Sequence, residues 1–301
     1  MTGPPVSVIL GSNMPTSPSP SDFIVSPGVV NVASVPQRSP FRYPGGKTWL
    51  IPRFRAWMRS LRRRPRTFIE PFAGGGAIAL TVAMENLAER VVMSEIDPSV
   101  AAVWKVIIHG DYPALVAKIM RFQISRETVI EALSEAPKGL VNRAFQTIVR
   151  NRVQRGGILA PGASLVKRGE NGKGVGSRWY PLTLARRIAA IAEVRNRIVF
   201  RQADGMEIIA GHVDDPSAAY FVDPPYTAGG KRAGTRLYTF SRLDHAKLFE
   251  LLAQARGPAM ITYDDAAEPR VLARQHGFAV EKVRMSNAHH STMTELVITK
   301  P

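Results

Sequence analysis

The chain has 301 residues, is 45% hydrophobic, contains no cysteine and carries 40 Lys plus Arg against 24 Asp plus Glu, a formal net charge of +16. This length accommodates one sizeable core with a smaller accessory domain, and the lack of cysteine excludes disulfides, thiolate metal sites and thiol nucleophiles. No apolar run reaches the roughly eighteen residues of a membrane span, and the apolar stretch 6–10 lacks the length and basic leader of a signal peptide. We therefore expect a soluble, cytoplasmic protein without a membrane partner.

The first elements in chain order are a tail and the opening of an α/β domain. Residues 1–37 are rich in Pro and Ser, contain no Lys or Arg, and predict a disordered tail. A short apolar strand over Thr67–Glu70 leads into a glycine loop at Gly74–Gly76 and a helix over Ala77–Leu87. A second strand at Val91–Met93 then ends in acidic residues at 95–97. Strand, glycine loop, helix, strand and acid form the opening of a doubly wound α/β domain with a mostly parallel sheet.

The middle of the chain has a helical pattern. Helices are predicted over Tyr112–Phe122, Arg126–Ala136 and Leu140–Val153, with a glycine-rich basic loop at 156–176. Apolar strands then resume at 198–200, 219–222, 259–262 and 296–298, and a Ser-x-x-Asp helix start at 241–244 precedes a leucine stripe at 248–252. We expect a core built from residues 38–104 and 196–301, interrupted by a helical insertion at 105–195.

The positive charge is concentrated in the insertion. From Lys138 to Arg201 there are fourteen Lys or Arg and two acidic residues, a net +12 of the total +16. A basic surface can serve solubility alone. Clustering of this kind is instead typical of contact with a phosphate backbone, so nucleic acid is the expected partner.

The glycine loop predicts a ligand site at the end of the first strand. The segment Glu70–Gly76 joins a strand to a helix, where glycines let the backbone approach a ligand and the helix N–H groups attract a negative group. A dinucleotide pyrophosphate, the carboxylate of a methionine moiety and a purely structural turn all fit this pattern. The spacing is not Gly-x-Gly-x-x-Gly and no P-loop lysine follows, which weakens the nucleotide-phosphate interpretation.

Acidic residues follow the next two strands. Glu95 closes the second strand, where an acid in this architecture accepts hydrogen bonds from ribose hydroxyls. Asp97 is the alternative for that role, and a cap for the helix that begins at Pro98 is an equal interpretation. Asp204 follows the third strand, where it serves either as an acceptor from an adenine amino group or as a surface turn.

The most specific motif is Asp223-Pro224-Pro225-Tyr226 after the apolar strand at 219–222. An exocyclic base amine is a poor nucleophile because its lone pair is delocalised into the ring. The Asp223 carboxylate and the Pro224 carbonyl, each accepting one N–H bond, would favour the pyramidal nitrogen that attacks a sulfonium methyl. Tyr226 would stack on a base flipped out of the duplex. A plain strand-to-turn junction is the alternative, since Asp-Pro commonly opens turns.

Three motifs occur in a family-specific order: Phe41-Arg42-Tyr43-Pro44-Gly45-Gly46-Lys47, then Glu70-Pro71-Phe72-Ala73-Gly74-Gly75-Gly76, then Asp223-Pro224-Pro225-Tyr226. Together they resemble the Dam-type (D12 class) family of site-specific N6-adenine DNA methyltransferases. The ending from Lys282 to Ile298 is similar to the last hairpin of that family, so the resemblance spans about 40–300. It implies a Rossmann-like class I methyltransferase core, S-adenosyl-L-methionine as cofactor, double-stranded DNA as partner, and a prokaryotic or phage-type protein, with restriction-modification as one setting.

The resemblance assigns roles to named residues. The implied catalytic residues are Asp223, Pro224, Pro225 and Tyr226. The implied cofactor-binding residues are Tyr43, Lys47, Glu70, Phe72, Gly74, Gly76, Glu95, Asp204 and Asp223. Lys47 would pair with the methionine carboxylate, and Glu95 stands where the family usually has Asp.

The insertion occupies the place of the family's DNA-recognition region. Arg152, Arg155, Lys167, Arg168 and Arg178 are the expected DNA contacts, without a distinction between base and phosphate contacts. The insertion departs from the GATC-methylating members, so no target sequence is transferred. No metal is expected, and a monomer suffices because one active site serves one methyl transfer.

Three rival functions stay open at this level. An N4-cytosine methyltransferase acts on the same kind of amine, but such enzymes more often have Ser at the first position of the tetrad. An RNA methyltransferase is disfavoured because the resemblance includes the DNA-recognition insertion. A DNA-binding protein on an inactive methyltransferase scaffold is disfavoured by the intact Asp223 and Lys47.

Overall fold

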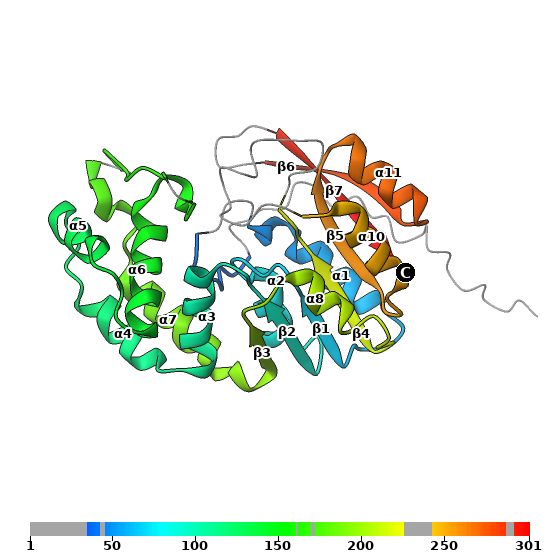
Figure 1. Cartoon of the computed structure of the whole chain (residues 1–301), viewed down its shortest axis with the longest axis horizontal. Helices are drawn as coiled ribbons and strands as arrows, with labels where there is room; N and C mark the ends of the chain where they lie inside the picture. Colours follow the sequence, from blue (N-terminus) through cyan, green and yellow to red (C-terminus); the bar gives the residue numbers. More distant parts are fainter. Residues whose placement is uncertain (1–34, 43–45, 161, 170–171, 226–242, 287–291) are drawn as a thin grey trace, which may run out of the picture.

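The computed structural model describes residues 35–42, 46–160, 162–169, 172–225, 243–286 and 292–301. These residues contain a seven-stranded sheet with the order β3-β2-β1-β4-β5-β7-β6 (Figure 1). The strands are β1 (Thr67–Glu70), β2 (Arg90–Ser94), β3 (Ile198–Arg201), β4 (Ala218–Val222), β5 (Ala259–Asp264), β6 (Ala279–Ser286) and β7 (Thr292–Lys300). The strands β3, β2, β1, β4 and β5 run parallel, whereas β7 is antiparallel to both β5 and β6. The predicted doubly wound, mostly parallel α/β fold is confirmed.

Alternation along the strands directs apolar side chains to both faces of the sheet. Phe68 and Phe221 point to one face, and Ile69 and Val222 point to the other, each within a buried cluster. Both faces must therefore be covered, which is why these strands read as continuous apolar runs. The first face is covered by α1 (Ile51–Ser60), α2 (Ala77–Met84) and α3 (Pro98–His109), and the second by α8 (Gly205–Ala210), α10 (His245–Gln254) and α11 (Ala267–Gln275).

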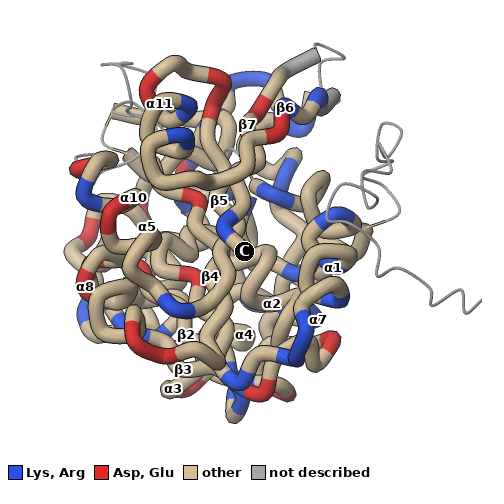
Figure 2. Tube along the Cα trace, turned by 90° about the vertical axis from the view of Figure 1, so that its right-hand side faces the viewer, with Lys and Arg blue, Asp and Glu red and all other residues tan. Residues whose placement is uncertain are grey.

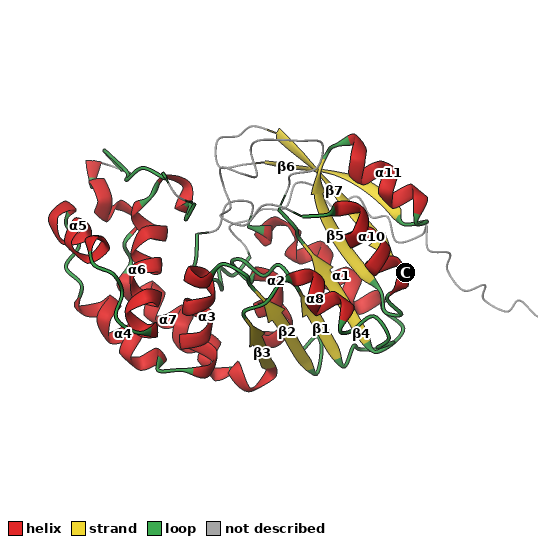
Figure 3. Ribbon diagram, in the orientation of Figure 1, coloured by secondary structure: helices red, strands yellow, loops and turns green. Residues whose placement is uncertain are grey.

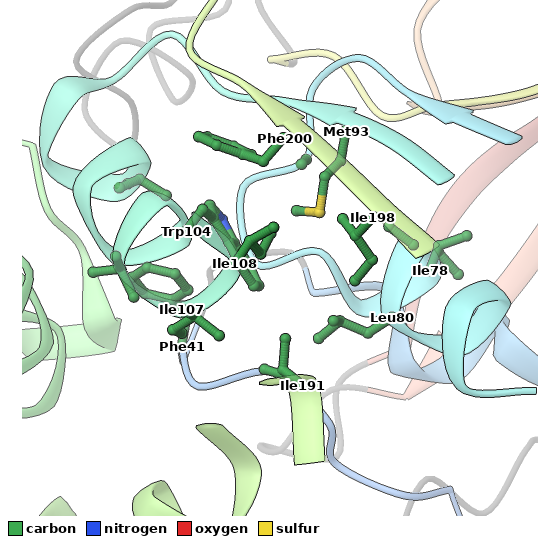
Figure 4. Packing of buried hydrophobic residues seen from close by; sticks show 14 of the residues in the cluster. Phe41, Ile78, Leu80, Met93, Trp104, Ile107, Ile108, Ile191, Ile198 and Phe200 are labelled. Carbon is green, nitrogen blue, oxygen red and sulfur yellow. The ribbon is translucent and has the colours of Figure 1, made fainter. Parts of the chain in front are cut away.

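Four further helices lie together beside the sheet, next to α3 (Figure 3). They are α4 (Tyr112–Arg121), α5 (Arg126–Ser134), α6 (Leu140–Val153) and α7 (Pro181–Glu193). These helices share one hydrophobic cluster with α3 and the sheet, in which Trp104 and Ile107 join Ile148 and Ile188 (Figure 4 shows the α3 side). The predicted boundary between 104 and 105 falls within α3, which packs against the sheet and the insertion alike.

Most predicted elements are present with small changes in their ends. The helix predicted over Leu140–Val153 has the predicted bounds, and the one predicted over Ala77–Leu87 ends at Met84. The helix expected from the 241–244 spacing begins at His245, because Asp244 is its N-cap and accepts a hydrogen bond from the Lys247 N–H. Residues 1–34 of the predicted tail lie outside the described residues.

Within the described residues, no single helix is long and apolar enough to cross a bilayer. The pair α3 and α4 passes the length and composition criteria together, with a bend of 116° between them.

Candidate active site

A cavity of about 540 Å³ lies at the carboxyl ends of β1, β2, β3 and β4. In open α/β sheets a ligand crevice forms where the strand order reverses, and here that point lies between β1 and β4. The volume falls within the about 300–1,000 Å³ typical of small-molecule sites. Segments following all four strands line the cavity, together with residues of the insertion and of the stretch before α1.

The glycine loop forms the cavity wall after β1. Gly76 is the N-cap of α2 with a positive φ of 62°, and a Cβ there would lie 3.0 Å from the Trp104 ring. Because glycine has no side chain to cap the helix, the first-turn N–H of Ala79 needs another acceptor. The Glu70 carboxylate supplies it, at 2.5 Å. Trp104 Nε1 also donates to the Gly74 carbonyl at 3.0 Å, which ties the loop to α3.

Glu70 is a buried helix-capping group at the cavity wall. Burial raises the pKa of Glu70 well above its ordinary value, against the lowering effect of the Ala79 N–H. Only 3% of its surface is exposed, although it does line the cavity. Its predicted contact with a cofactor stays a prediction, beside the capping role that the structure shows.

Glu95 faces the cavity from the end of β2. Its two carboxylate oxygens accept hydrogen bonds from the Gly74 N–H at 3.1 Å and the Asp97 N–H at 2.9 Å. Burial raises the pKa of Glu95 to about 7, with the neighbouring Asp97 carboxylate contributing in the same direction. Each carboxylate oxygen can accept more than one hydrogen bond, so hydroxyl donors of a ligand fit the chemistry of this group.

Asp97 and Asp204 both cap helices at the same edge. Asp97 accepts from the Ser99 N–H at 2.8 Å at the start of α3, which confirms the capping interpretation. Asp204 accepts from the Met206 N–H at 2.9 Å at the start of α8. Both residues line the cavity. A Cβ at Gly205 would lie 2.6 Å from the Phe72 ring, so glycine is needed there for Phe72 to pack on α8.

Asp223 stands at the end of β4 within a buried ionic network. Lys47 Nζ lies 3.0 Å from Asp223 Oδ1 and 3.5 Å from Glu295 Oε2, and Thr262 Oγ1 donates to Asp223 Oδ1 at 2.8 Å. Burial disfavours the charged lysine, but the Asp223 and Glu295 carboxylates outweigh it and raise the pKa of Lys47. The predicted partner of Lys47 was a cofactor carboxylate; in this structure its partners are two carboxylates of the protein.

Four arginines, three of them from the insertion, form another part of the cavity wall. We call Arg42, Arg152, Arg178 and Arg187 the arginine cluster; all four line the cavity. Arg152 Nη2 donates to the Pro40 carbonyl at 2.5 Å and Arg187 Nη1 to the Ser39 carbonyl at 3.1 Å. Arg152 is only 5% exposed, so it is a cavity residue rather than part of the outer surface.

Asn151 joins the insertion to the stretch before α1. Its side chain accepts from the Arg42 N–H at 2.8 Å and donates to the Arg42 carbonyl at 2.9 Å, as a paired strand would. It also donates to the Gly157 carbonyl at 2.8 Å. The insertion thereby holds residues 39–42 against the cavity.

The structure brings most of the predicted site residues together. The cavity lining includes Lys47, Glu70, Phe72, Gly74, Gly76, Glu95, Asp204, Asp223, Pro225, Arg152 and Arg178. Pro224 is buried beside this set, whereas Arg155, Lys167 and Arg168 are exposed on the insertion. Tyr43 and Tyr226 lie outside the described residues, so their roles stay predictions.

Four residues of the site escaped the sequence analysis. Thr262 and Glu295 complete the Asp223 network, and Arg42 and Arg187 complete the arginine cluster. Glu295 carries a signal, because it is a single acid within the apolar run 294–298. Nothing in the pattern separates Arg187 from its neighbour Arg186. Among the described residues no group of three His, Asp or Glu is arranged to hold a metal ion.

In a comparison with known protein families, residues 43–138 match the D12 class N6 adenine-specific DNA methyltransferase family. The remainder of the predicted resemblance, beyond residue 138, stays a prediction. No curated protein matches the chain.

Several solved structures match the chain at low similarity. An rRNA methyltransferase, aviRa, from Streptomyces viridochromogenes is 14% identical, with 90% of this chain and 93% of that chain covered and a TM-score of 0.39. The precorrin-6y C5,15-methyltransferase from Geobacter metallireducens is 9% identical, with 81% and 85% covered and a TM-score of 0.31. The cavity lies at the switch point of a doubly wound sheet, and residues 43–138, which contribute to its wall, match the D12 class N6 adenine-specific DNA methyltransferase family.

Proposed function

We propose that the protein transfers a methyl group from S-adenosylmethionine to N6 of an adenine flipped out of duplex DNA. The observation that carries the proposal is the position of Asp223, which opens the Asp-Pro-Pro-Tyr tetrad and shares one cavity with the glycine loop, Glu95 and Asp204. The family match at residues 43–138 supports the adenine specificity and the DNA substrate.

The cavity fits the proposed cofactor in charge and hydrogen bonding. S-adenosylmethionine supplies an electrophilic methyl group on a sulfonium, and it carries cationic groups that acidic residues attract. Glu95 has the acceptor oxygens for ribose hydroxyls, and Asp204 could accept from the adenine amino group. The N–H groups at the start of α2 and the close backbone approach that glycine allows at Gly74, with its φ of 46°, suit the amino-acid end.

The chemistry proposed for Asp223 follows from its anchoring. Lys47 and Thr262 both contact its Oδ1 atom and so orient the carboxylate. In this orientation Asp223 would accept one N–H bond of the target amine, and the Pro224 carbonyl would accept the other. Two such acceptors localise the nitrogen lone pair for attack on the methyl group. Tyr226 is the proposed stacking partner of the flipped base.

The proposal is tested by methyl transfer from tritiated S-adenosylmethionine to unmethylated bacterial DNA, followed by digestion to nucleosides. The wild-type chain is expected to yield N6-methyladenine. Asp223→Ala should lower the rate by about a thousandfold, since it removes a group that stabilises charge in the transition state. Binding of S-adenosylmethionine should change much less.

The matched control is Asp214→Ala. Asp214 is an exposed carboxylate ahead of β4, at the opposite end of the strand that leads to Asp223, and its loss should leave the rate unchanged. Full activity of Asp223→Ala would refute the proposed mechanism. N4-methylcytosine as the product, or label found only in RNA, would instead transfer the assignment to one of the rival substrates.

A further inference from the structure

The arginine cluster gathers four guanidinium groups around one part of the cavity. They come from separate parts of the chain: Arg42 precedes α1, Arg152 lies on α6, Arg178 follows the glycine-rich basic loop, and Arg187 lies on α7. Arg152 is almost fully buried and the other three are half-buried. The hydrogen bonds to Ser39 and Pro40 hold two of these side chains in place before any ligand arrives.

This cluster brings like charges together at a cost. Burial, and with it repulsion from Arg187, Arg42 and Arg178, lowers the pKa of Arg152 to about 9. Burial also lowers the pKa of Arg42 and of Arg187. Among the described residues, no Asp or Glu forms an ion pair with Arg42, Arg152 or Arg187. Buried charges are normally paired, so these three arginines lack a counter-charge among the described residues.

Arg152 also has an unmet hydrogen-bond donor. Its Nε has no hydrogen-bond partner among the described residues, although the atom is buried. A buried donor without a partner costs about 1–3 kcal/mol, so such atoms in folded proteins commonly mark a ligand or an ion. An anion beside the cluster would relieve the repulsion and offer acceptors to these donors.

From this geometry we infer that the arginine cluster is a binding site for the phosphodiester group next to the target nucleotide. The inference rests on the proposed function, because it assigns the anion to the nucleic-acid substrate. Guanidinium groups match phosphate oxygens in charge and in planar, two-pronged geometry. A phosphate held here would fix the backbone of the nucleotide whose base enters the same cavity as Asp223.

The amino-acid end of the cofactor is a poorer occupant. Its carboxylate is accompanied by an ammonium group, and the sulfonium adds a further positive charge, so four arginines would repel as much as they attract. Those cationic groups are better placed at the glycine loop, where the Gly74 N–H donates to the Glu95 carboxylate. A phosphodiester carries negative charge alone, and it is therefore the better counter-charge.

The first test measures thermal unfolding of the full chain with inorganic phosphate or chloride at equal ionic strength. Phosphate should stabilise the wild-type chain, and Arg187→Gln should weaken phosphate binding by about tenfold, because hydrogen bonds to charged groups contribute about 1.5–3 kcal/mol. Without phosphate, Arg187→Gln should be at least as stable as wild type, since one repelling charge is removed. A merely structural arginine would predict a loss of stability regardless of phosphate.

The matched control is Arg186→Gln, the same change on the exposed neighbouring residue of α7. This variant should keep the phosphate response. Absence of stabilisation by phosphate in the wild-type chain, or equal responses from both variants and wild type, would overturn the inference.

The second test separates a nucleotide phosphate from a free anion. We expect dAMP to bind the wild-type chain at least about tenfold more tightly than deoxyadenosine, and this difference to collapse in Arg187→Gln. A phosphate response without any advantage for dAMP would refute the nucleotide assignment. Failure of the proposed function would look different: the wild-type chain would not methylate adenine, while the phosphate response and its loss in Arg187→Gln would persist.

Discussion

Glu95 is the residue whose ionisation most directly affects the proposed cofactor site. Its pKa of about 7 lies above the ordinary value of a glutamate because burial disfavours the carboxylate. Because its ordinary pKa is 4.5, ionised Glu95 lowers the free energy of unfolding above about pH 7. This penalty is relieved as the pH falls from about 7 toward 4.5 and the carboxylate is protonated in the folded protein. Ribose hydroxyls and a cationic cofactor both favour the ionised form.

We therefore predict that affinity for S-adenosylmethionine rises with pH through about 7. If only ionised Glu95 binds well, the ionised fraction, and with it the affinity, should increase about tenfold between pH 6 and pH 8. Calorimetric titrations without DNA would measure this dependence. Glu95→Gln should bind weakly with no such slope, whereas Glu89→Gln, an exposed glutamate ahead of β2, should behave as wild type. A flat profile for the wild-type chain would contradict the prediction.

Lys47 is the counter-charge of two carboxylates in the Asp223 network. Glu295 is 5% exposed, so removing the lysine takes a nearby cation away from a buried carboxylate. Lys47→Met should lower the free energy of unfolding by about 3 kcal/mol. Adding Glu295→Gln to this variant should recover part of that loss, which urea denaturation would measure. If the double variant is no more stable than Lys47→Met, the Lys47–Glu295 pair does not contribute as described.

At the scale of elements, the loop after α6 and the stretch before α1 are locked to each other. Gly157 has a φ of +73° and packs directly on the Arg42 carbonyl, while Asn151 bonds the Arg42 backbone on both sides. Only glycine combines that conformation with such a close approach. The insertion therefore contributes to the cavity by positioning residues 39–42, in addition to any contact with DNA.

A pair of glycine variants separates conformational strain from this close contact. A Cβ at Gly157 would overlap the Arg42 carbonyl oxygen, whereas a Cβ at Gly162, which has a φ of +84°, would meet nothing within 4 Å. Gly162→Ala should cost about 1 kcal/mol of unfolding free energy from the positive φ alone. Gly157→Ala should cost about 3 kcal/mol, because the overlap is added. Equal losses in urea denaturation would show that the close contact contributes nothing.

At the scale of the whole molecule, basic residues extend well beyond the cavity. Figure 2 shows Lys and Arg on α1 and α7 as well as in the connecting segments. The exposed residues Arg155, Lys167 and Arg168 belong to the insertion that lines the cavity. In contrast, Arg59 lies in the last turn of α1, and Arg62 and Arg63 lie between α1 and β1, at the amino edge of the sheet. We propose that the first set contacts the duplex whose base would enter the cavity, and that the second set does not.

We predict that the two sets differ in the salt dependence of DNA binding. Replacing Arg155, Lys167 and Arg168 with alanine should reduce the slope of log affinity against log salt by about 2 to 3, since each lost phosphate contact removes about 0.9. The same change at Arg59, Arg62 and Arg63 should leave the slope nearly unaltered. Fluorescence anisotropy of a labelled duplex across a salt series measures both. Identical slopes for the two triple variants would rule out a localised DNA surface on the insertion.

Local patterning was sufficient to predict the sheet, the glycine loop and the tetrad. The strands Thr67–Glu70 and Ala218–Val222 are continuous apolar runs because both faces of a parallel sheet are buried, and such runs are visible without knowledge of the fold. The placement of Glu95 and Asp223 at the cavity likewise follows from their positions directly after strands, since parallel strands end at one edge.

The sequence shows which residues end each strand and therefore share the edge of the cavity. Which of these residues contact one another depends on the tertiary structure. Lys47 and Glu295 are 248 residues apart and meet only because β7 inserts antiparallel beside β5. Arg187 differs from Arg186 only in facing the cavity. Charge pairing depends on distances of a few ångströms in three dimensions, and no periodicity along the chain encodes those distances.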